Sequence, residues 1–339
     1  MLRRITLASL ALAGLLLAAC GAGSDEPDAS SPATPTAATQ SRTPMATPTD
    51  PPDPPKELRV AFINLFSPLS LDADNPQADL TFDDRLDIVI KELKAFNPDI
   101  VGFNEASVTK AHGAVAAKLA RELKMEPQYA RANPWFPGQS KEQSDDLAKQ
   151  LGFEEGELLL SRYPILRAER RALNPRTSEA GEGRAALHAV IKGPGDVGEI
   201  DVFITHLTGG GDKVRRAQAA DFATFIANTR GKGPTIVMAG GSDPKAGSTY
   251  DFYSAIGLYD VAGDAPVVTC CRDRVSGEQP PLESRTDYLM SARWTPSSWA
   301  LFGNKPQKRA DGTWLYASDH NGIEAVFPVP IPSTAVAGP

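Results

Sequence analysis

The sequence predicts an α/β domain in which two β-sheets pack face to face and helices cover their outer faces. Two observations predict this fold class: many short apolar segments of strand length alternate with a few amphipathic helical segments, and the chemically interesting polar residues follow the ends of those apolar segments. The chain has 339 residues, of which 41% are hydrophobic and 23% charged, so it is long enough to bury a core. This composition excludes a polytopic membrane protein, a fibrous repeat and a wholly disordered chain.

Residues 1–20 have the order of a bacterial export signal. Arg3 and Arg4 precede an apolar stretch, which is shorter than the roughly 20 residues of a membrane-spanning helix. The run 17–20, Leu-Ala-Ala-Cys, resembles the lipobox in which the cysteine is lipidated. We therefore expect an extracytoplasmic protein anchored by Cys20 to the cell membrane or the outer membrane, with a plain secretory signal as the alternative.

Three further segments follow the leader. Residues 21–56 are rich in Pro, Ser and Thr and lack apolar periodicity, so we expect a disordered tether. Residues 57–330 form one predicted domain, and 331–339 a tail.

The predicted elements of the domain begin with a strand over 58–66, which is rich in β-forming apolar residues. A helix is expected over 82–96 because the apolar residues from Leu86 to Leu93 share one face, and Asn97-Pro98 ends it. By the same reasoning, further strands are expected at 99–103, 158–160, 185–191, 200–205, 235–238, 287–290 and 322–327, and further helices at 111–124 and 214–228.

Seven short motifs follow these elements in a definite order. They are Asn64, Phe103-Asn104-Glu105, Leu160-Ser161-Arg162-Tyr163-Pro164, Thr205-His206-Leu207, Met238-Ala239-Gly240, Arg285-Thr286-Asp287-Tyr288 and Ser318-Asp319-His320. In this order they resemble the endonuclease/exonuclease/phosphatase family, whose fold is DNase I-like. The resemblance covers nearly the whole domain and implies a four-layer α/β sandwich that hydrolyses phosphate esters with magnesium, or with manganese or calcium in its place.

The resemblance implies a metal site of hard oxygen ligands. Glu105 would be the principal ligand, with Asn64 and Asp319 nearby, because carboxylate and amide oxygens suit a divalent cation that also binds phosphate. The alternative for Glu105 is an ordinary surface glutamate.

The resemblance also assigns the catalytic residues. His320 would take a proton from water, oriented by Asp287, because imidazole titrates near neutral pH. His206 would donate a hydrogen bond to a non-bridging phosphate oxygen, and Asn64 would help to bind the substrate. His112 and His188 match no catalytic motif, and we expect them to be structural or surface residues.

One motif departs from the family. Most members carry Gly-Asp-x-Asn where this chain has Gly240-Gly241-Ser242-Asp243, so a glycine replaces the aspartate and an aspartate replaces the phosphate-binding asparagine. In one interpretation Asp243 takes over a catalytic and substrate-binding role. In the other, the chain is a phosphate- or nucleotide-binding lipoprotein that has lost catalysis on the same fold.

Several residues leave alternatives open. Glu157 either contacts His206 or faces water, and Arg184 either approaches phosphate or is solvated. Cys270 and Cys271 form either a vicinal disulfide or two buried thiols; a metal–thiolate site is disfavoured because no nearby histidine completes a ligand set.

The substrate and partners are limited by charge. The formal charge of −7 and the absence of a basic stripe predict no strong nonspecific binding of nucleic acid. Family members cut DNA, phosphoinositides, sphingomyelin or nucleotides, and the sequence does not choose among them. The segment containing Trp294, Trp299, Leu301 and Phe302 contacts a lipid or a base in one interpretation, and is a packed loop in the other. We expect a monomer.

Overall fold

The computed structural model describes residues 55–68, 77–136, 138–175, 183–243 and 248–330. The predicted signal peptide with Cys20, most of the tether and the tail 331–339 lie outside these residues. Within the described ranges, no helix combines the length and the apolar character that a membrane span needs.

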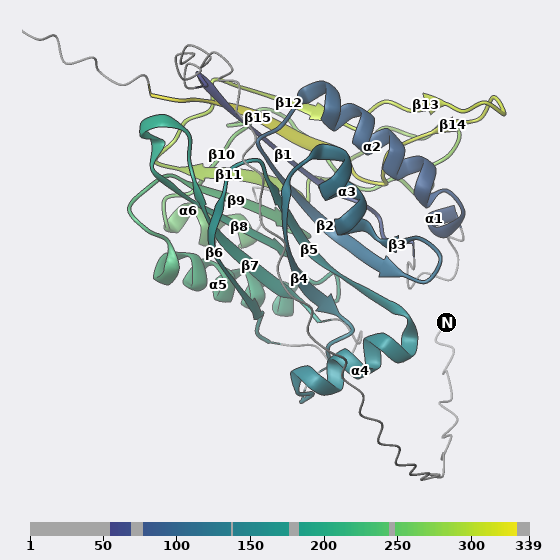
Figure 1. The fold of residues 1–339 in the computed structure, drawn as a ribbon, viewed down its shortest axis with the longest axis horizontal. Coiled ribbons are helices and arrows are strands. Elements are labelled where there is room, and N and C mark those ends of the chain that lie inside the picture. The colour runs from purple at the N-terminus through teal and green to yellow at the C-terminus, as the bar shows by residue number, and fades with distance from the viewer. Residues whose placement is uncertain (1–54, 69–76, 137, 176–182, 244–247, 331–339) are drawn as a thin grey trace, which may run out of the picture. The chain divides into compact units, whose positions relative to one another are not determined.

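The described residues form two mixed β-sheets (Figure 1). The first sheet has the order β12-β15-β1-β2-β5-β4, with β3 paired to β2; its strands are β1 (Glu57–Asn64), β2 (Ile100–Thr109), β3 (Gly113–Ala114), β4 (Glu126–Asn133), β5 (Phe153–Ser161), β12 (Ser298–Phe302) and β15 (Gly322–Pro328). The second has the order β10-β11-β9-β8-β7-β6; its strands are β6 (Ile165–Ala172), β7 (Ala185–Lys192), β8 (Glu199–His206), β9 (Thr235–Gly240), β10 (Tyr259–Asp260) and β11 (Tyr288–Ala292). A small hairpin pairs β13 (Gln307–Lys308) with β14 (Trp314–Leu315).

The helices cover the outer faces of the sheets. Along the first sheet lie α2 (Phe82–Phe96) and α3 (Val115–Leu123), and along the second lie α5 (Asp212–Thr229) and α6 (Ser248–Ala255), as Figure 1 shows. The remaining short helices are α1 (Gln77–Leu80), α4 (Lys141–Leu151) and the 3₁₀ turn Gly195–Val197. The predicted four-layer sandwich is therefore confirmed.

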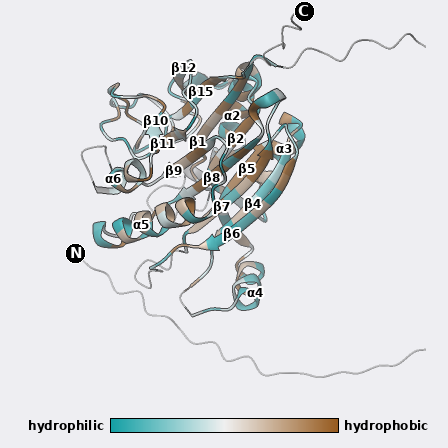
Figure 2. Ribbon diagram, turned by 90° about the vertical axis from the view of Figure 1, so that its left-hand side faces the viewer, coloured by the Kyte–Doolittle hydropathy of each residue, from teal (hydrophilic) through white to brown (hydrophobic). Residues whose placement is uncertain are grey.

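Each pair of layers buries its own apolar cluster. The inner cluster joins the two sheets, with Val60, Leu159, Val202 and Met238 among its buried residues. Figure 2 shows the hydrophobic colouring concentrated on the strands in the middle of the sheets. Successive residues of a strand point to opposite faces of its sheet, and here both faces carry buried apolar residues. Each sheet is therefore covered on both sides, by helices on one and by the other sheet on the other.

The two sheets end together at the predicted site. In the first sheet β1 and β2 run parallel and place Asn64 opposite Asn104; in the second, β8 and β9 run parallel and place His206 opposite Gly240. Asn104 crosses between the sheets, because its Nδ2 donates to the carbonyl oxygen of Thr205 at 3.2 Å. Gly240 permits this approach, since a Cβ there would lie 2.1 Å from Asn104 Oδ1.

Several elements were not predicted. The longer ones are β4, β6, β12, α4 and α6; the short elements β3, β10, β13, β14, α1 and the 3₁₀ turn were not predicted either. The edge strand β6 is mostly exposed, and α4 buries only Ser144 and Ala148, so neither carries the apolar periodicity on which the prediction depended. The predicted strand at 99–103 is also too short, because β2 continues to Thr109.

The aromatic segment after β11 is packed. Trp299, Leu301 and Phe302 belong to β12, and Trp294 donates its indole N–H to the carbonyl oxygen of Pro328 at 2.9 Å. Trp294, Trp299 and Leu301 pack against the inner cluster, so the packing alternative accounts for them. Trp299 and Leu301 do so from a strand, and Trp294 from the loop before it.

The close approach of the sheets gives a stability prediction. A Cβ at Gly102 would lie 2.1 Å from Met238 Sδ and 3.0 Å from Ile204 Cδ1, so Gly102→Ala overpacks the core. We expect a loss of about 1–3 kcal/mol in the free energy of unfolding, measured in urea. In a Met238→Ala background the same change will cost less; an equal cost in both backgrounds would contradict this packing.

Candidate active site

Glu105 occupies a strained position in the middle of β2. The register between β2 and β5 shifts between Phe103 and Ala106, and Glu105 adopts a left-handed φ of 57°. Non-glycine residues rarely adopt this conformation, and such strain is concentrated at functional sites. The carboxylate accepts hydrogen bonds from Asn64 Nδ2 and from the Ser67 backbone N–H, both at 2.9 Å. From the sequence, Glu105 is expected at the end of a strand. In the structure the strand continues to Thr109, and Glu105 lies at an irregularity of the β2–β5 pairing within it.

His320 and Asp287 form the predicted pair. His320 Nδ1 lies 2.6 Å from Asp287 Oδ2, and both residues are buried. Because an ionised carboxylate only accepts, Nδ1 carries the proton and Nε2 faces away from Asp287. Burial alone would lower the pKa of His320, but the charges of Asp287 and Asp319 raise it to about 10.

His206 has the opposite electrostatic character. Its Nδ1 lies 3.0 Å from a guanidinium nitrogen of Arg184, and Arg184 can only donate, so His206 Nδ1 accepts and Nε2 carries the proton. Burial lowers the pKa of His206 well below its usual range, and the charge of Arg184 lowers it further. His206 is therefore a neutral hydrogen-bond donor at neutral pH, and the solvated alternative for Arg184 is wrong because Arg184 is buried.

Six predicted residues come together as one cluster. We call the following residues the six-residue cluster: Asn64, Glu105, His206, Asp287, Asp319 and His320. Glu105 Oε1 lies 3.8 Å from His206 Nδ1, and Asp319 Oδ1 lies 3.9 Å from His320 Nε2. The two halves interact electrostatically: burial raises the pKa of Asp319, and the charge of Glu105 raises it further.

Arg85 was not predicted, yet it supports both halves of the cluster. This buried residue of α2 donates to the carbonyl oxygens of Leu65 and Phe66, each at 2.8 Å, and to that of Ala317 at 3.5 Å. Burial lowers its pKa to about 10, while Asp319 and Glu105 oppose that shift. A charged side chain on the apolar face of the predicted helix, three residues after Phe82, was the signal that could have identified it.

Glu157 does not face water. It is 1% exposed and accepts a hydrogen bond from Asn104 Nδ2. Burial raises its pKa to about 8, and burial together with the charge of Glu105 raises the pKa of neighbouring Glu155 to about 7. Glu155 was also missed by sequence reasoning.

Asp243 is held in an ion pair. Its Oδ1 accepts from Arg215 Nε of α5 at 2.6 Å, and its backbone N–H donates to Thr249 Oγ1 at 2.7 Å. Arginine therefore already balances its negative charge. Gly241 has a φ of 66°, and a Cβ there would lie 2.5 Å from the carbonyl oxygen of Leu207. The backbone at this position is shaped for glycine, so the family aspartate has no unstrained place in it.

The two adjacent cysteines lie at the site. Cys270 and Cys271 form a vicinal disulfide, and Cys271 Sγ lies 3.5 Å from His320 Nε2. The expectation that no histidine lies near them is therefore wrong. His188, in contrast, is structural: its Nε2 lies 2.8 Å from Asp201 Oδ1, and its ring stacks on Phe203. His112 lies between Asp79 and Asp83.

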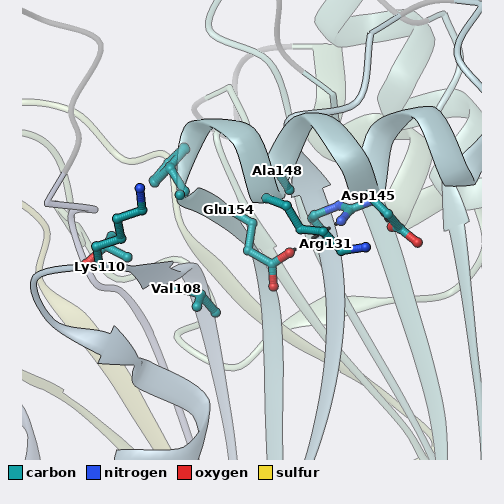
Figure 3. Close-up of a pocket in the computed structure, with 10 residues that line it drawn as sticks. Val108, Lys110, Arg131, Asp145, Ala148 and Glu154 are labelled. Carbon is teal, nitrogen blue, oxygen red and sulfur yellow. Dashed lines mark hydrogen bonds and ion pairs between the residues drawn. The ribbon is translucent and has the colours of Figure 1, made fainter. Parts of the chain in front are cut away.

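A separate pocket of about 470 Å³ lies between α4 and the strands β2, β4 and β5 (Figure 3). Its lining includes none of the predicted site residues. Arg131 in this pocket donates to Asp145 Oδ1 and to Glu154 Oε2 at 3.3 Å, so its charge is paired.

Comparison with solved structures supports the fold. An endonuclease/exonuclease/phosphatase family protein of Bacteroides thetaiotaomicron has a TM-score of 0.61 and 16% identity, over 82% of this chain and 99% of that chain. A mannosyl-6-phosphatase of Bacteroides thetaiotaomicron VPI-5482 has a TM-score of 0.61 and 17% identity, over 80% and 100% of the two chains. D. rerio TDP2 complexed with a single-strand DNA product has a TM-score of 0.53 and 18% identity, over 81% and 100%.

The described domain therefore has the fold of endonuclease/exonuclease/phosphatase proteins, as the motif order predicted. No protein-family model and no curated protein sequence matches the chain.

The buried carboxyl of Glu157 makes stability depend on pH. A raised pKa keeps this group protonated in the folded state up to about pH 8, whereas in the unfolded chain it ionises above about pH 4.5, so the folded state loses relative stability between these values. We expect the stability of Glu157→Gln relative to wild type to grow by about 3–4 kcal/mol from pH 5 to pH 8, at about 1.4 kcal/mol per pKa unit. Urea unfolding measures this. A pH-independent difference, or an equal one for Glu169→Gln on exposed β6, would contradict it.

The loop after β9 gives a second prediction. Replacing Gly241 by Asp together with Asp243→Asn reproduces the family motif, but we expect a loss of about 1–3 kcal/mol in unfolding free energy and no gain of activity, because of the left-handed backbone and the Leu207 carbonyl oxygen. Asp243→Asn alone is the matched control. A double variant as stable as this control would disprove the backbone argument.

Proposed function

We propose that this protein is a metal-dependent phosphoesterase. The observation that carries the proposal is the arrangement of two histidines, one protonated and one neutral, beside the carboxylates of Asp319 and Glu105 respectively. His320 is held by Asp287 and lies near Asp319, and neutral His206 lies near Glu105. One histidine can exchange a proton while the other donates a hydrogen bond to a phosphate oxygen.

The donor set fits a hard divalent cation. Asn64 faces Glu105 with its amide nitrogen at 2.9 Å and so orients that carboxylate, while its amide oxygen accepts from the Phe66 backbone N–H at 2.8 Å. Glu105 and Asp319 offer carboxylate oxygens whose charges act on each other. Magnesium prefers such oxygens, with manganese and calcium as alternatives. A bound cation would polarise the phosphoryl group and, by offsetting the carboxylate charge, would let His320 lose its ring proton.

The protein's own residues then have distinct roles. His320 Nε2 would accept a proton from the attacking water, while Asp287 holds Nδ1–H and stabilises the imidazolium that forms. His206 Nε2–H would donate to a non-bridging oxygen, and Arg184 keeps its tautomer in that form. Asp243, paired with Arg215, receives no proton-transfer step in this mechanism.

The substrate is a phosphate ester, either a phosphomonoester or a phosphodiester. Among proteins of similar fold, one is a mannosyl-6-phosphatase and another was solved with a single-strand DNA product, which supports both possibilities. The net charge of −7 disfavours strong nonspecific binding of nucleic acid. We further propose that lipidated Cys20 anchors a monomeric protein outside the cytoplasm.

A second candidate is a phosphate-binding lipoprotein without catalysis. It is favoured by the loop after β9, where Gly241 replaces a carboxylate and Arg215 pairs with Asp243. This candidate predicts phosphate-ester binding without turnover.

Replacing the proton-transfer histidine tests the enzyme directly. We expect His320→Ala to lower magnesium-dependent hydrolysis of a generic phosphodiester or phosphomonoester by about 100-fold or more, with the fold intact by circular dichroism. His112→Asn, at a histidine held by two surface aspartates, is the control and should retain full activity. Equal activity in His320→Ala and wild type would reject the assignment.

Replacing the metal ligand tests the cation site. We expect Glu105→Gln to shift the magnesium dependence of activity to at least about tenfold higher concentration, because the amide removes a negative charge from the donor set. Glu126→Gln on β4 serves as a control. An unchanged magnesium titration in Glu105→Gln would exclude Glu105 as a ligand.

A further inference from the structure

The vicinal disulfide lies directly against the proposed catalytic histidine. Cys271 Sγ is 3.5 Å from His320 Nε2, and the ligand atoms of Cys270, Cys271 and His320 all lie within 4.8 Å of one another. Cys270 is buried, whereas Cys271 is exposed, so solvent reaches the group from one side. The three residues are therefore close enough to share a single ion once the sulfurs are free.

His320 is oriented as a metal-binding histidine. Its Nδ1 hydrogen-bonds Asp287 Oδ2 at 2.6 Å, which leaves Nε2 on the side of the sulfurs. Metal-ligating histidines commonly have this arrangement, with a carboxylate on the far ring nitrogen that fixes the tautomer. The hydrogen bond to Asp287, which orients His320 for proton transfer, thus also orients it to bind a metal ion.

The separation of Cys271 from His320 fits a tetrahedral soft-metal site. A zinc ion with a bond of about 2.3 Å to sulfur and about 2.0 Å to nitrogen places these two ligand atoms about 3.5 Å apart. This is the separation between Cys271 Sγ and His320 Nε2. Three protein ligands also leave one coordination position for water, as in zinc sites with an open position.

The segment that carries the cysteines is anchored on both sides. Thr269 Oγ1 accepts from the Asp287 backbone N–H at 3.1 Å, and the Arg272 backbone N–H donates to the Asp319 carbonyl oxygen at 2.9 Å. The Arg272 guanidinium also donates to the carbonyl oxygen of Ser318. These bonds do not involve the sulfurs, so they keep the cysteines beside His320 after the disulfide is opened.

We propose that reduction of the Cys270–Cys271 disulfide creates a site for a thiophilic divalent cation, Zn²⁺ or Cd²⁺, formed by both sulfurs and His320 Nε2. A dithiol reductant supplies two electrons and two protons: the sulfur–sulfur bond breaks, two thiols form and the reductant becomes a disulfide. Metal binding then releases both thiol protons and the proton on His320 Nε2, and the ion occupies Nε2. The predicted loss of activity rests on the proposed function, because the occupied Nε2 no longer accepts a proton from water. The predicted metal binding does not rest on that function.

The test is a cadmium titration followed by ultraviolet absorption of the thiolate–cadmium bond. The protein carries Cys20→Ser, which leaves Cys270 and Cys271 as its cysteines, and magnesium is held constant. Oxidised protein is compared with protein that has been reduced by a dithiol and freed of reductant under nitrogen. Hydrolysis of a phosphate ester is measured on the same samples.

We expect the reduced protein to bind one Cd²⁺ per chain, with the thiolate absorption, and to lose at least about 90% of its activity, whereas the oxidised protein shows neither effect. His320→Ala should bind Cd²⁺ at least about tenfold more weakly. The same protein, reduced and then alkylated with iodoacetamide, has both thiols blocked and should show no absorption.

Either of two results would overturn the proposal: no stoichiometric absorption in the reduced protein, or an equal cadmium affinity in reduced His320→Ala. A protein without activity in any form would contradict the phosphoesterase function, and the absorption would still decide the metal site.

Discussion

The excess of buried negative charge at one end of the two sheets is the constraint on which the site depends. Five carboxyl groups interact there: Glu105, Glu155, Glu157, Asp287 and Asp319. The guanidinium groups of Arg85, Arg184 and Arg272 act on them. Carboxylates removed from water need a counter-charge, a proton or a metal ion. Protonated His320 supplies a counter-charge, and Glu157 keeps a proton up to about pH 8. A divalent cation would meet the third need.

This charge is brought together by the topology of the fold. Parallel pairs in both sheets end at the same level, and the close approach at Gly240 lets Asn104 bridge the sheets. Arg85 reaches from a helix to the loops that follow Asn64 and precede Asp319. Packing of the apolar strands therefore brings these charged groups close together. The free energy gained by burying the apolar core offsets the repulsion among them.

The sequence predicted the central strands and helices, because these carry strong apolar periodicity; helix 82–96 has the same bounds in the structure. It also predicted the pair His320–Asp287 and the proximity of Glu105 to Asn64, through the order of the motifs. The bulge at Glu105, the ion pair of Asp243 and the buried role of Arg85 could not be predicted, because each depends on contacts between residues far apart in the chain. Edge strand β6 and helix α4 were missed because most of their side chains remain in contact with water.

Paramagnetic relaxation by Mn²⁺ tests most directly whether one cation lies among these groups. The chain has four histidines, whose ring protons can be assigned by replacing each in turn. We expect substoichiometric Mn²⁺ to broaden the resonances of His206 and His320 and to leave those of His112 and His188 sharp. Broadening of His112 or His188 first, or an unchanged spectrum of His206 and His320, would contradict a metal site within the six-residue cluster.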